Sequence, residues 1–240
     1  IIMATAYQPN IVTDNLSLCL DVSNPKSYSG GSTWKDLANG IEFASSGTQT
    51  PIATREGIRC FEFNGSGYWS SQGGTSQSDK VDMGGDCTLI IWLYSEAVPV
   101  RKTIFEKAGI GAGSYQQEVA VTWEVSEAWS YYSRLSPAYD YANGWTAVIG
   151  KWNMVAIKMS TGRTATSRTG FRSLNGSAWA SSYTSRSDTA LTSAGAVRVG
   201  TGYAGTVAVG AIGSVLCYNK MLDDDEILHN YNATKGKFGI

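Results

Sequence analysis

The sequence predicts an all-β protein, a two-sheet sandwich with one short helix at its end. Of its 240 residues, 27 are glycine and only 16% are charged, against about 25% in an average soluble protein. Many turn formers and few leucines favour many short strands over helices. With 42% apolar residues the chain can bury a sizeable core, and all-β domains of about 200–250 residues are common.

Hydrophobic patterning places the strands. Apolar and polar residues alternate over 16–22, which predicts a strand with one buried face. Residues 87–94 are apolar at both alternating sets of positions, which predicts a central strand covered on both sides. Other apolar runs between Gly-, Ser- or Thr-rich turns predict strands at 58–63, 103–107, 118–125, 152–159, 196–199 and 207–218. Without a linker or internal repeat, residues 14–240 are expected to form one domain.

The C-terminal residues predict a short amphipathic helix packed on the sandwich. Asp223 and Glu226 have the spacing of a capping box, and Leu222 and Ile227 that of a hydrophobic staple. The residues expected on its buried face are Ile227, Leu228 and Tyr231. Gly236 is expected to end the helix. We therefore interpret the acidic run at its start as helix capping rather than as a metal site.

Residues 1–13 predict an extended N-terminal arm. They are mostly polar or small, contain Pro9 and lack strand alternation, so they cannot fold alone. We expect the arm to lie against a neighbouring subunit, with Tyr7, Ile11 and Val12 as its apolar contacts. No apolar run approaches the roughly 20 residues of a membrane span, and no signal peptide is recognised at the start.

The cysteines and acidic residues give little support to a metal site. The cysteines are Cys19, Cys60, Cys87 and Cys217. None is at metal-ligand spacing from another, and we expect buried free thiols on strands. A Cys19–Cys217 disulfide is the alternative if the first and last strands are neighbours. No cofactor is expected, although Asp79, Asp82 and Asp86 form a loose cluster that leaves Ca²⁺ as a less favoured alternative.

The sequence does not predict an enzyme. Glu118 and Glu124 share a strand face but lie roughly 20 Å apart, whereas a glycosidase pair needs about 5–9.5 Å. The single histidine, His229, falls one residue off the core face of the helix, so we expect it to be solvated rather than catalytic. A net charge of −1 lacks the electrostatic footprint of a nucleic-acid-binding protein.

Several short motifs follow one another in an order known from one group of β-sandwiches. Residues 20–28 read LDVSNPKSY, 33–37 TWKDL, 61–65 FEFNG and 151–156 KWNMVA, and the end includes GAIG at 210–213 and NYNA at 230–233. They resemble the laminin-G-like, concanavalin A-type jelly-roll domains found in virion proteins of tailed phages. The resemblance covers nearly the whole chain from residue 14.

This resemblance implies a jelly roll and a non-enzymatic role in a phage particle. The expected role is that of a capsid decoration, head-fibre or tail-associated module, made in the host cytoplasm and located on the virion surface. The expected partners are other virion proteins, such as capsid or tail subunits, or further copies of the chain, but neither nucleic acid nor membrane. Because the fold also hosts lectins, recognition of host surface glycans is the alternative.

One aromatic-rich stretch is the candidate surface for either kind of binding. Such rings are common in sugar-binding sites and protein interfaces, and the alternative is that they are strand residues covering the core. The candidates are Trp129, Tyr131, Tyr132, Tyr139, Tyr141 and Trp145. Residues 141–187 also contain six basic and no acidic side chains. We interpret them as a solvated face, with docking onto an acidic neighbour as the alternative.

Overall fold

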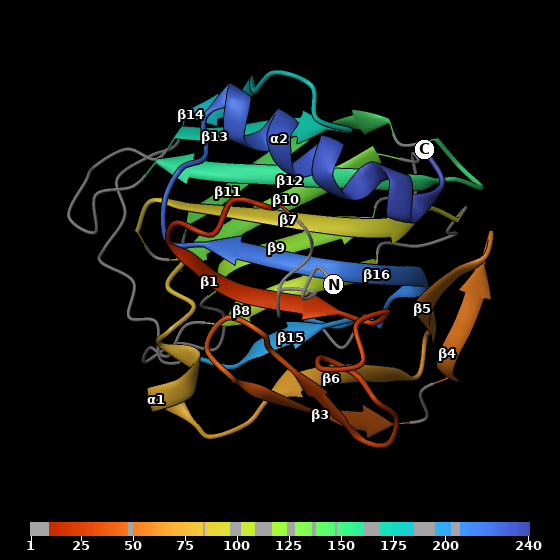
Figure 1. Ribbon diagram of the computed structural model, residues 1–240. Coiled ribbons are helices and arrows are strands. Elements are labelled where there is room, and N and C mark those ends of the chain that lie inside the picture. The colour runs from red at the N-terminus through yellow and green to blue at the C-terminus, as the bar shows by residue number, and fades with distance from the viewer. Residues whose placement is uncertain are drawn as a thin grey trace.

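The computed structural model is a sandwich of two eight-stranded antiparallel sheets, with one helix outside the first sheet (Figure 1). This confirms the predicted fold class. The structure describes residues 10–47, 50–83, 85–96, 102–108, 117–123, 128–135, 138–146, 148–160, 169–184, 195–202 and 207–240. Within these residues, no helix is long and apolar enough to cross a membrane.

The first sheet contains the central strands. In sheet order, its strands are β14 (Ala180–Thr184), β13 (Thr169–Leu174), β12 (Trp152–Ser160), β7 (Cys87–Tyr94), β16 (Val209–Tyr218), β5 (Ile58–Asn64) and β4 (Thr50–Arg55). Along the edge of β16 that faces away from β7, the first residues pair with β5 and the last residues pair with β1 (Leu16–Asp21). The long strand β16 therefore lies between β1, near the start of the chain, and the central strand β7.

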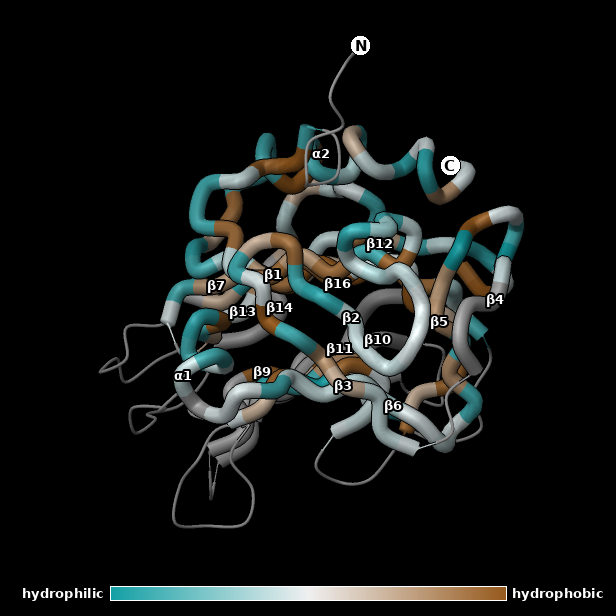
Figure 2. Tube along the Cα trace, turned by 60° about the horizontal axis from the view of Figure 1, so that its bottom comes forward, coloured by the Kyte–Doolittle hydropathy of each residue, from teal (hydrophilic) through white to brown (hydrophobic). Residues whose placement is uncertain are grey.

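The second sheet ends in an aromatic-rich hairpin. In sheet order, its strands are β11 (Ala138–Thr146), β10 (Ala128–Leu135), β9 (Gln117–Trp123), β8 (Lys102–Ala108), β15 (Val197–Val199), β6 (Gly67–Ser71), β3 (Glu42–Gly47) and β2 (Thr33–Lys35). A single helical turn, α1 (Thr75–Ser78), follows β6. Figure 2 shows the sandwich from another side, with apolar stretches on strands of both sheets.

Aromatic rings fill one part of the core between the two sheets. Tyr28, Trp34, Phe61 and Trp69 are almost completely buried, and the ring centroids of the contacting pairs lie 4.7–5.8 Å apart. Most of these pairs meet edge to face, the geometry that the charge distribution of aromatic rings favours. The opening motifs noted in the sequence therefore contribute core residues.

A second core lies between the first sheet and the C-terminal helix. The ring of Phe238 stacks on Trp92 at a centroid distance of 4.3 Å. A Cβ atom at Gly213 would lie 2.3 Å from that ring, so glycine is required there for close approach. On β7, Ile91 faces the inner core and Ile90 the outer one. This confirms that β7 is covered on both sides.

The strand β1 differs from its prediction because both of its faces are buried. Leu18 and Leu20 belong to the inner core, while Cys19 belongs to the outer core. The outer face is covered because the N-terminal segment, including Ile11, packs in the same cluster as the C-terminal helix. The alternation of apolar and polar residues predicted the strand, but it did not indicate that its outer face is also buried.

The register of β1 also excludes the Cys19–Cys217 disulfide. The two strands are neighbours, as the alternative required, but Cys217 lies opposite Leu18 and Cys19 lies opposite Leu216. Successive residues of a strand point to opposite faces, so the two thiols lie in different cores. All four cysteines are buried and free, as the sequence predicted.

The helix α2 (Asp224–Thr234) begins as predicted. Asp223 is the N-cap, and its side chain and that of Glu226 form a reciprocal capping box. Leu222 and Ile227, the predicted staple residues, are both fully buried. Carboxylates near a helix N-terminus also interact favourably with the helix dipole, which agrees with the capping interpretation.

The buried face and the end of α2 differ from the prediction. Leu228 is 45% exposed, and the buried residues are Ile227, Asn230 and Thr234. Gly236 lies inside a 3₁₀ helix, η1 (Lys235–Phe238), and Gly239 ends it with a left-handed φ of 72°. The helix turns its polar Asn230 inward because that side chain has buried hydrogen-bond partners, which hydrophobic spacing does not reveal.

Candidate functional site

A short loop between β11 and β12 is held in place by a buried side chain. Asn153 is fully buried, and its Nδ2 donates to the Ser95 hydroxyl (3.1 Å) and to the carbonyls of Val148 and Lys151 (3.0 Å each). In return, the Val148 N–H donates to Asn153 Oδ1 (3.3 Å). The Gly150 N–H donates to the Ser95 carbonyl (2.9 Å). We call residues 148–151 the Asn153-held loop.

This loop presents apolar side chains to solvent. The exposed fraction of the residue is 57% for Val148 and 36% for Ile149. Among the residues whose side chains the structure describes, the other large apolar residues with comparable exposure are Leu228 and Ile240. Because buried hydrogen bonds already fix this backbone, the exposed apolar pair would lose little ordering free energy on binding a partner.

A charged cluster lies just beyond the end of β7, where Glu96 directly follows Ser95. Arg55, the last residue of β4, forms ion pairs with Glu62 and with Glu96, the latter at 2.9 Å. Its guanidinium lies 5.7 Å from the ring centroid of Tyr94. Burial alone would lower the pKa of Arg55, but the carboxylates of Glu96 and Glu62 outweigh it and raise this pKa. Both side chains therefore share one cation as their partner.

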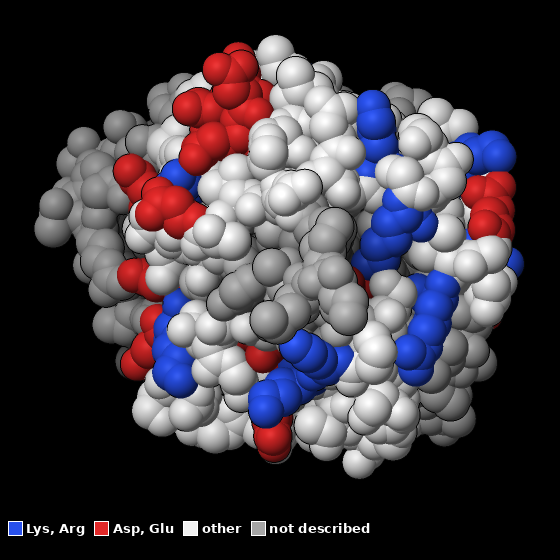
Figure 3. All heavy atoms as spheres, in the orientation of Figure 1, with Lys and Arg blue, Asp and Glu red and all other residues white. Residues whose placement is uncertain are grey.

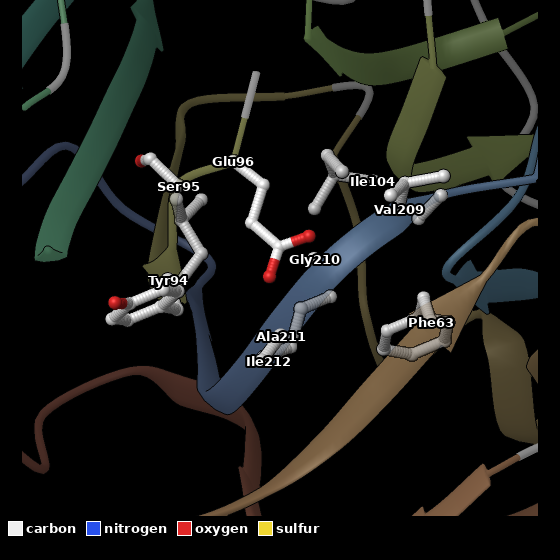
Figure 4. Close-up of a pocket in the computed structure, with 11 residues that line it drawn as sticks. Phe63, Tyr94, Ser95, Glu96, Ile104, Val209, Gly210, Ala211 and Ile212 are labelled. Carbon is white, nitrogen blue, oxygen red and sulfur yellow. The ribbon is translucent and has the colours of Figure 1, made fainter. Parts of the chain in front are cut away.

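A small pocket lies beside the charged cluster, and the carboxylate of Glu96 points into it (Figure 4). Its walls are mainly apolar and come from β5, β7, β8 and β16, with Phe63, Ile104 and Ile212 among them. Its volume is about 10 Å³, which is about the space for one water molecule. This pocket cannot admit a sugar ring.

The predicted aromatic surface falls on the hairpin of β10 and β11. The backbone register places Trp129 opposite Trp145, Tyr132 opposite Tyr141 and Tyr131 opposite Ala142, while Tyr139 lies opposite Arg134. The side chains of these residues lie outside the described part of the structure. The pair Trp129 and Trp145 is at the open end of the hairpin, and β11 ends at Thr146, two residues before the Asn153-held loop.

The N-terminal contacts differ from their prediction. Ile11 is only 6% exposed and packs in the outer core of its own domain. The Val12 N–H donates to Asn230 Oδ1 (2.8 Å), and the Tyr218 hydroxyl donates to the Val12 carbonyl (3.0 Å). Ile11 and Val12 therefore have contacts within this chain that the prediction did not include. The third predicted contact, Tyr7, lies outside the described residues.

His229 and the acidic candidates gain no catalytic or metal-binding geometry. His229 is exposed, as expected, and its Nε2 donates to the carbonyl of Asn10. Among the described residues, no three His, Cys, Asp or Glu side chains come together as a metal site. The calcium alternative that rested on Asp79, Asp82 and Asp86 is thus unsupported. Glu118 lies on β9, whereas Glu124 is outside the described residues.

The basic stretch is not one continuous docking face. Lys158 is half-buried, and its Nζ donates to the Leu222 carbonyl (2.8 Å) and lies 4.6 Å from the centroid of the Trp179 ring. Burial lowers the pKa of this lysine despite the nearby acidic start of α2. Lys158 thus helps to hold the start of α2 against the first sheet. The basic residues outside the description are Arg163, Arg168 and Arg186.

Comparison with known proteins identifies the fold class rather than a family. No protein-family model matches the chain, and no curated protein sequence matches it. A mutant of Trypanosoma rangeli sialidase displaying trans-sialidase activity is structurally similar with a TM-score of 0.66 and 16% identity, over 96% of this chain and 34% of that one. The binding domain of botulinum neurotoxin DC in complex with SialylT is similar with a TM-score of 0.65 and 14% identity. That match covers 92% of this chain and 52% of the other.

The binding domain of botulinum neurotoxin serotype C1 is similar at a TM-score of 0.64 and 13% identity, again over 92% of this chain and 52% of that one. The chain thus spans about a third to a half of the length of these structures. At such identities the likeness shows a shared β-sandwich fold and nothing finer. Because the sialidase match covers only a third of that enzyme, it does not transfer an activity.

Sequence reasoning missed both the Asn153-held loop and the charged cluster. Asn153 lies inside a predicted strand, where a polar residue is normally expected to face solvent. Arg55, Glu62 and Glu96 come from three separate elements, so only the sheet register brings them together. The adjacent pair Val148 and Ile149, next to Gly150 at the start of a predicted strand, was the one available signal for the loop.

Proposed function

We propose that this chain is a non-enzymatic structural module on the surface of a tailed-phage particle, and that it binds other particle proteins. The observation that carries the proposal is the Asn153-held loop, which exposes Val148 and Ile149 on a fixed backbone. The jelly-roll motifs of the sequence, which resemble those of phage virion proteins, supply the setting. Synthesis in the host cytoplasm is part of the same proposal.

The physical argument concerns the cost of binding. Association loses free energy when side chains and loops must be ordered at the interface, and a loop that is already fixed avoids part of that loss. Binding energy in protein interfaces is concentrated in a few apolar and aromatic residues surrounded by neutral contacts. Val148 and Ile149 provide exposed apolar groups of this kind, and the backbone register pairs Trp129 with Trp145 on the hairpin that precedes them.

The charged cluster supports a non-enzymatic role. In a glycosidase, one carboxyl group donates a proton while the other remains free to act as base or nucleophile. Here Arg55 forms ion pairs with both Glu62 and Glu96, so each carboxylate already has a protein partner. The adjacent pocket is also too small for a sugar. These two features favour a structural role for the cluster.

Incorporation into particles tests this proposal. The double variant Val148→Asp, Ile149→Asp places two charges in the exposed loop, and we expect it to fold normally but to lose most of its co-sedimentation with particles. Ile240→Asp is the matched control, because Ile240 is about as exposed but is the last residue of the chain, outside the loop. Unchanged co-sedimentation of the loop variant would refute the proposed binding surface.

Glycan recognition is the second candidate function. The observation that favours it is the β-sandwich likeness to a toxin binding domain described in complex with SialylT, together with the aromatic pair of Trp129 and Trp145. Aromatic faces stack on the apolar faces of sugars. Under this reading the same end of the hairpin would contact a host surface glycan instead of a particle protein.

A binding experiment separates the two candidates. Trp129→Ala and Trp145→Ala are tested for retention on immobilised sialic acid-containing glycans and on host surface polysaccharide, alongside particle co-sedimentation. Loss of retention with intact co-sedimentation would favour the lectin. Loss of co-sedimentation by a protein that never binds either glycan would favour the structural module.

A further inference from the structure

The outward face of α2 has a regular pattern that the proposed function does not use. Asp225, Leu228, Asn232 and Lys235 follow one another at spacings of three, four and three residues, so they form one stripe along the helix. Asp225, Leu228 and Asn232 are exposed and Lys235 is half-buried. The stripe lies opposite Ile227, Asn230 and Thr234, which face the outer core.

Charge is separated along this stripe. Acidic residues occupy the first turn of α2, and lysines follow its last turn. Figure 3 shows acidic groups gathered over the start of the helix and basic groups over its end, with uncharged surface between them. The exposed apolar residue Leu228 lies near the middle of the helix.

The two ends of the stripe have unused charges. Glu226 is paired with Lys220 (2.6 Å), and Lys237 is paired with the buried Asp21. Asp225 and Lys235, by contrast, form no ion pair among the described residues. The Nζ of Lys235 lies 5.4 Å from the ring centroid of Tyr231 on its own helix, a contact that leaves its charge available.

We propose that this face binds the same face of a second copy of the chain, with the two α2 helices antiparallel about a twofold axis. In that arrangement Asp225 of each copy lies opposite Lys235 of the other, and the two Leu228 side chains flank the axis. A parallel arrangement would place acid against acid and base against base. A twofold interface requires a self-complementary surface, and this stripe is one.

The size of the face sets the strength of the contact. A helix of eleven residues is about 16 Å long, so two such helices bury less than the roughly 1,200 Å² of a stable interface. The dimer is therefore weak in free solution. When many copies are held on one support, the effective concentration rises to the millimolar range, where such a contact forms. The inference stands independently of the proposed particle role.

Sedimentation velocity on the full chain tests the dimer directly. Between about 10 μM and about 1 mM, we expect the weight-average mass to rise toward a dimer at low salt, and to rise less at about 0.5 M salt. Asp225→Lys and Lys235→Glu each create like-charge contacts and should weaken association at least tenfold. The double variant Asp225→Lys, Lys235→Glu restores opposite charges across the axis and should regain most of the lost affinity.

Two further variants complete the test. Leu228→Asp should weaken association without altering the fold, and it remains informative if a charge reversal at the helix ends lowers stability. Lys26→Glu reverses an exposed lysine elsewhere on the molecule and should have no effect. A chain that stays monomeric at about 1 mM, or a double reversal no better than the single ones, would overturn the proposal.

Discussion

Asn153 shows how one buried polar residue determines the shape of a surface. Its amide contacts the Ser95 hydroxyl and three backbone groups of the loop, and its side chain is fully enclosed. A buried amide without such partners would be costly, whereas a satisfied one fixes its neighbours. The exposure of Val148 and Ile149 is therefore a consequence of a residue that no ligand would touch.

Replacing Asn153 with alanine should lower the free energy of unfolding by about 2 kcal/mol, because several polar groups lose their partner. Urea denaturation measures this change. Val148→Ser is the matched control in the same loop, and its effect should stay within about 0.5 kcal/mol because the side chain is exposed. An Asn153→Ala protein as stable as the wild type would mean that the loop is held by other contacts.

Cys60 makes stability depend on alkaline pH. Burial raises the pKa of this thiol from 9.0 to about 11. Since the unfolded chain releases the proton near pH 9 and the folded chain keeps it, stability is fully present below pH 9 and is lost as the pH rises toward 11.

We expect the free energy of unfolding to fall between pH 8.5 and 11 by up to about 2 kcal/mol more in the wild type than in Cys60→Ala. Urea denaturation at a series of pH values measures the difference in slope. Parallel pH profiles for the two proteins would show that the thiol titrates alike in the folded and unfolded chains.

At the scale of elements, strands with dense apolar sequences were predictable. The predicted ranges 87–94 and 152–159 match β7 and β12 closely, because long apolar runs between turn residues are specific to buried strands. The strands β2, β3, β4, β6, β10, β11, β13 and β14 were not predicted. Their sequences are rich in Ser, Thr, Gly and polar aromatic residues, so they do not stand out from turns.

The start of the chain and α2 form one unit through a buried polar network. Asn230 binds the Val12 N–H through Oδ1 and the Tyr218 hydroxyl through Nδ2, at 2.8 and 3.1 Å. The Trp92 indole donates to Thr234 Oγ1 (2.9 Å). Sequence patterning assigned residues 11 and 12 to a free arm because these long-range hydrogen bonds leave no periodic signal.

Asn230→Ala should cost about 2–3 kcal/mol of stability, since it leaves the Val12 N–H and the Tyr218 hydroxyl without this partner. Amide hydrogen exchange at Val12 should become faster by a larger factor than exchange in the central strand β7. Asn232→Ala, an exposed position on the same helix, is the control and should leave exchange at Val12 unchanged. Equal protection of Val12 in both variants would contradict the network.

At the scale of the whole molecule, the two proposed contact surfaces belong to different parts of the fold. The Asn153-held loop follows the hairpin of the second sheet, whereas α2 covers the outer face of the first sheet (Figure 1). The motifs predicted the sandwich because they mark core strands, but the candidate surface depends on residues brought together by the register of separate strands. Those contacts could not be predicted from local sequence.

The central claim is that the Asn153-held loop binds another particle protein, and cross-linking from that loop tests it most directly. A photoreactive residue is placed at position 148, or at position 26 as an exposed control, and assembled particles are irradiated and analysed by mass spectrometry. We predict a cross-link from position 148 to a different particle protein and none from position 26. Particles that contain the protein but give no such cross-link from position 148 would contradict the claim.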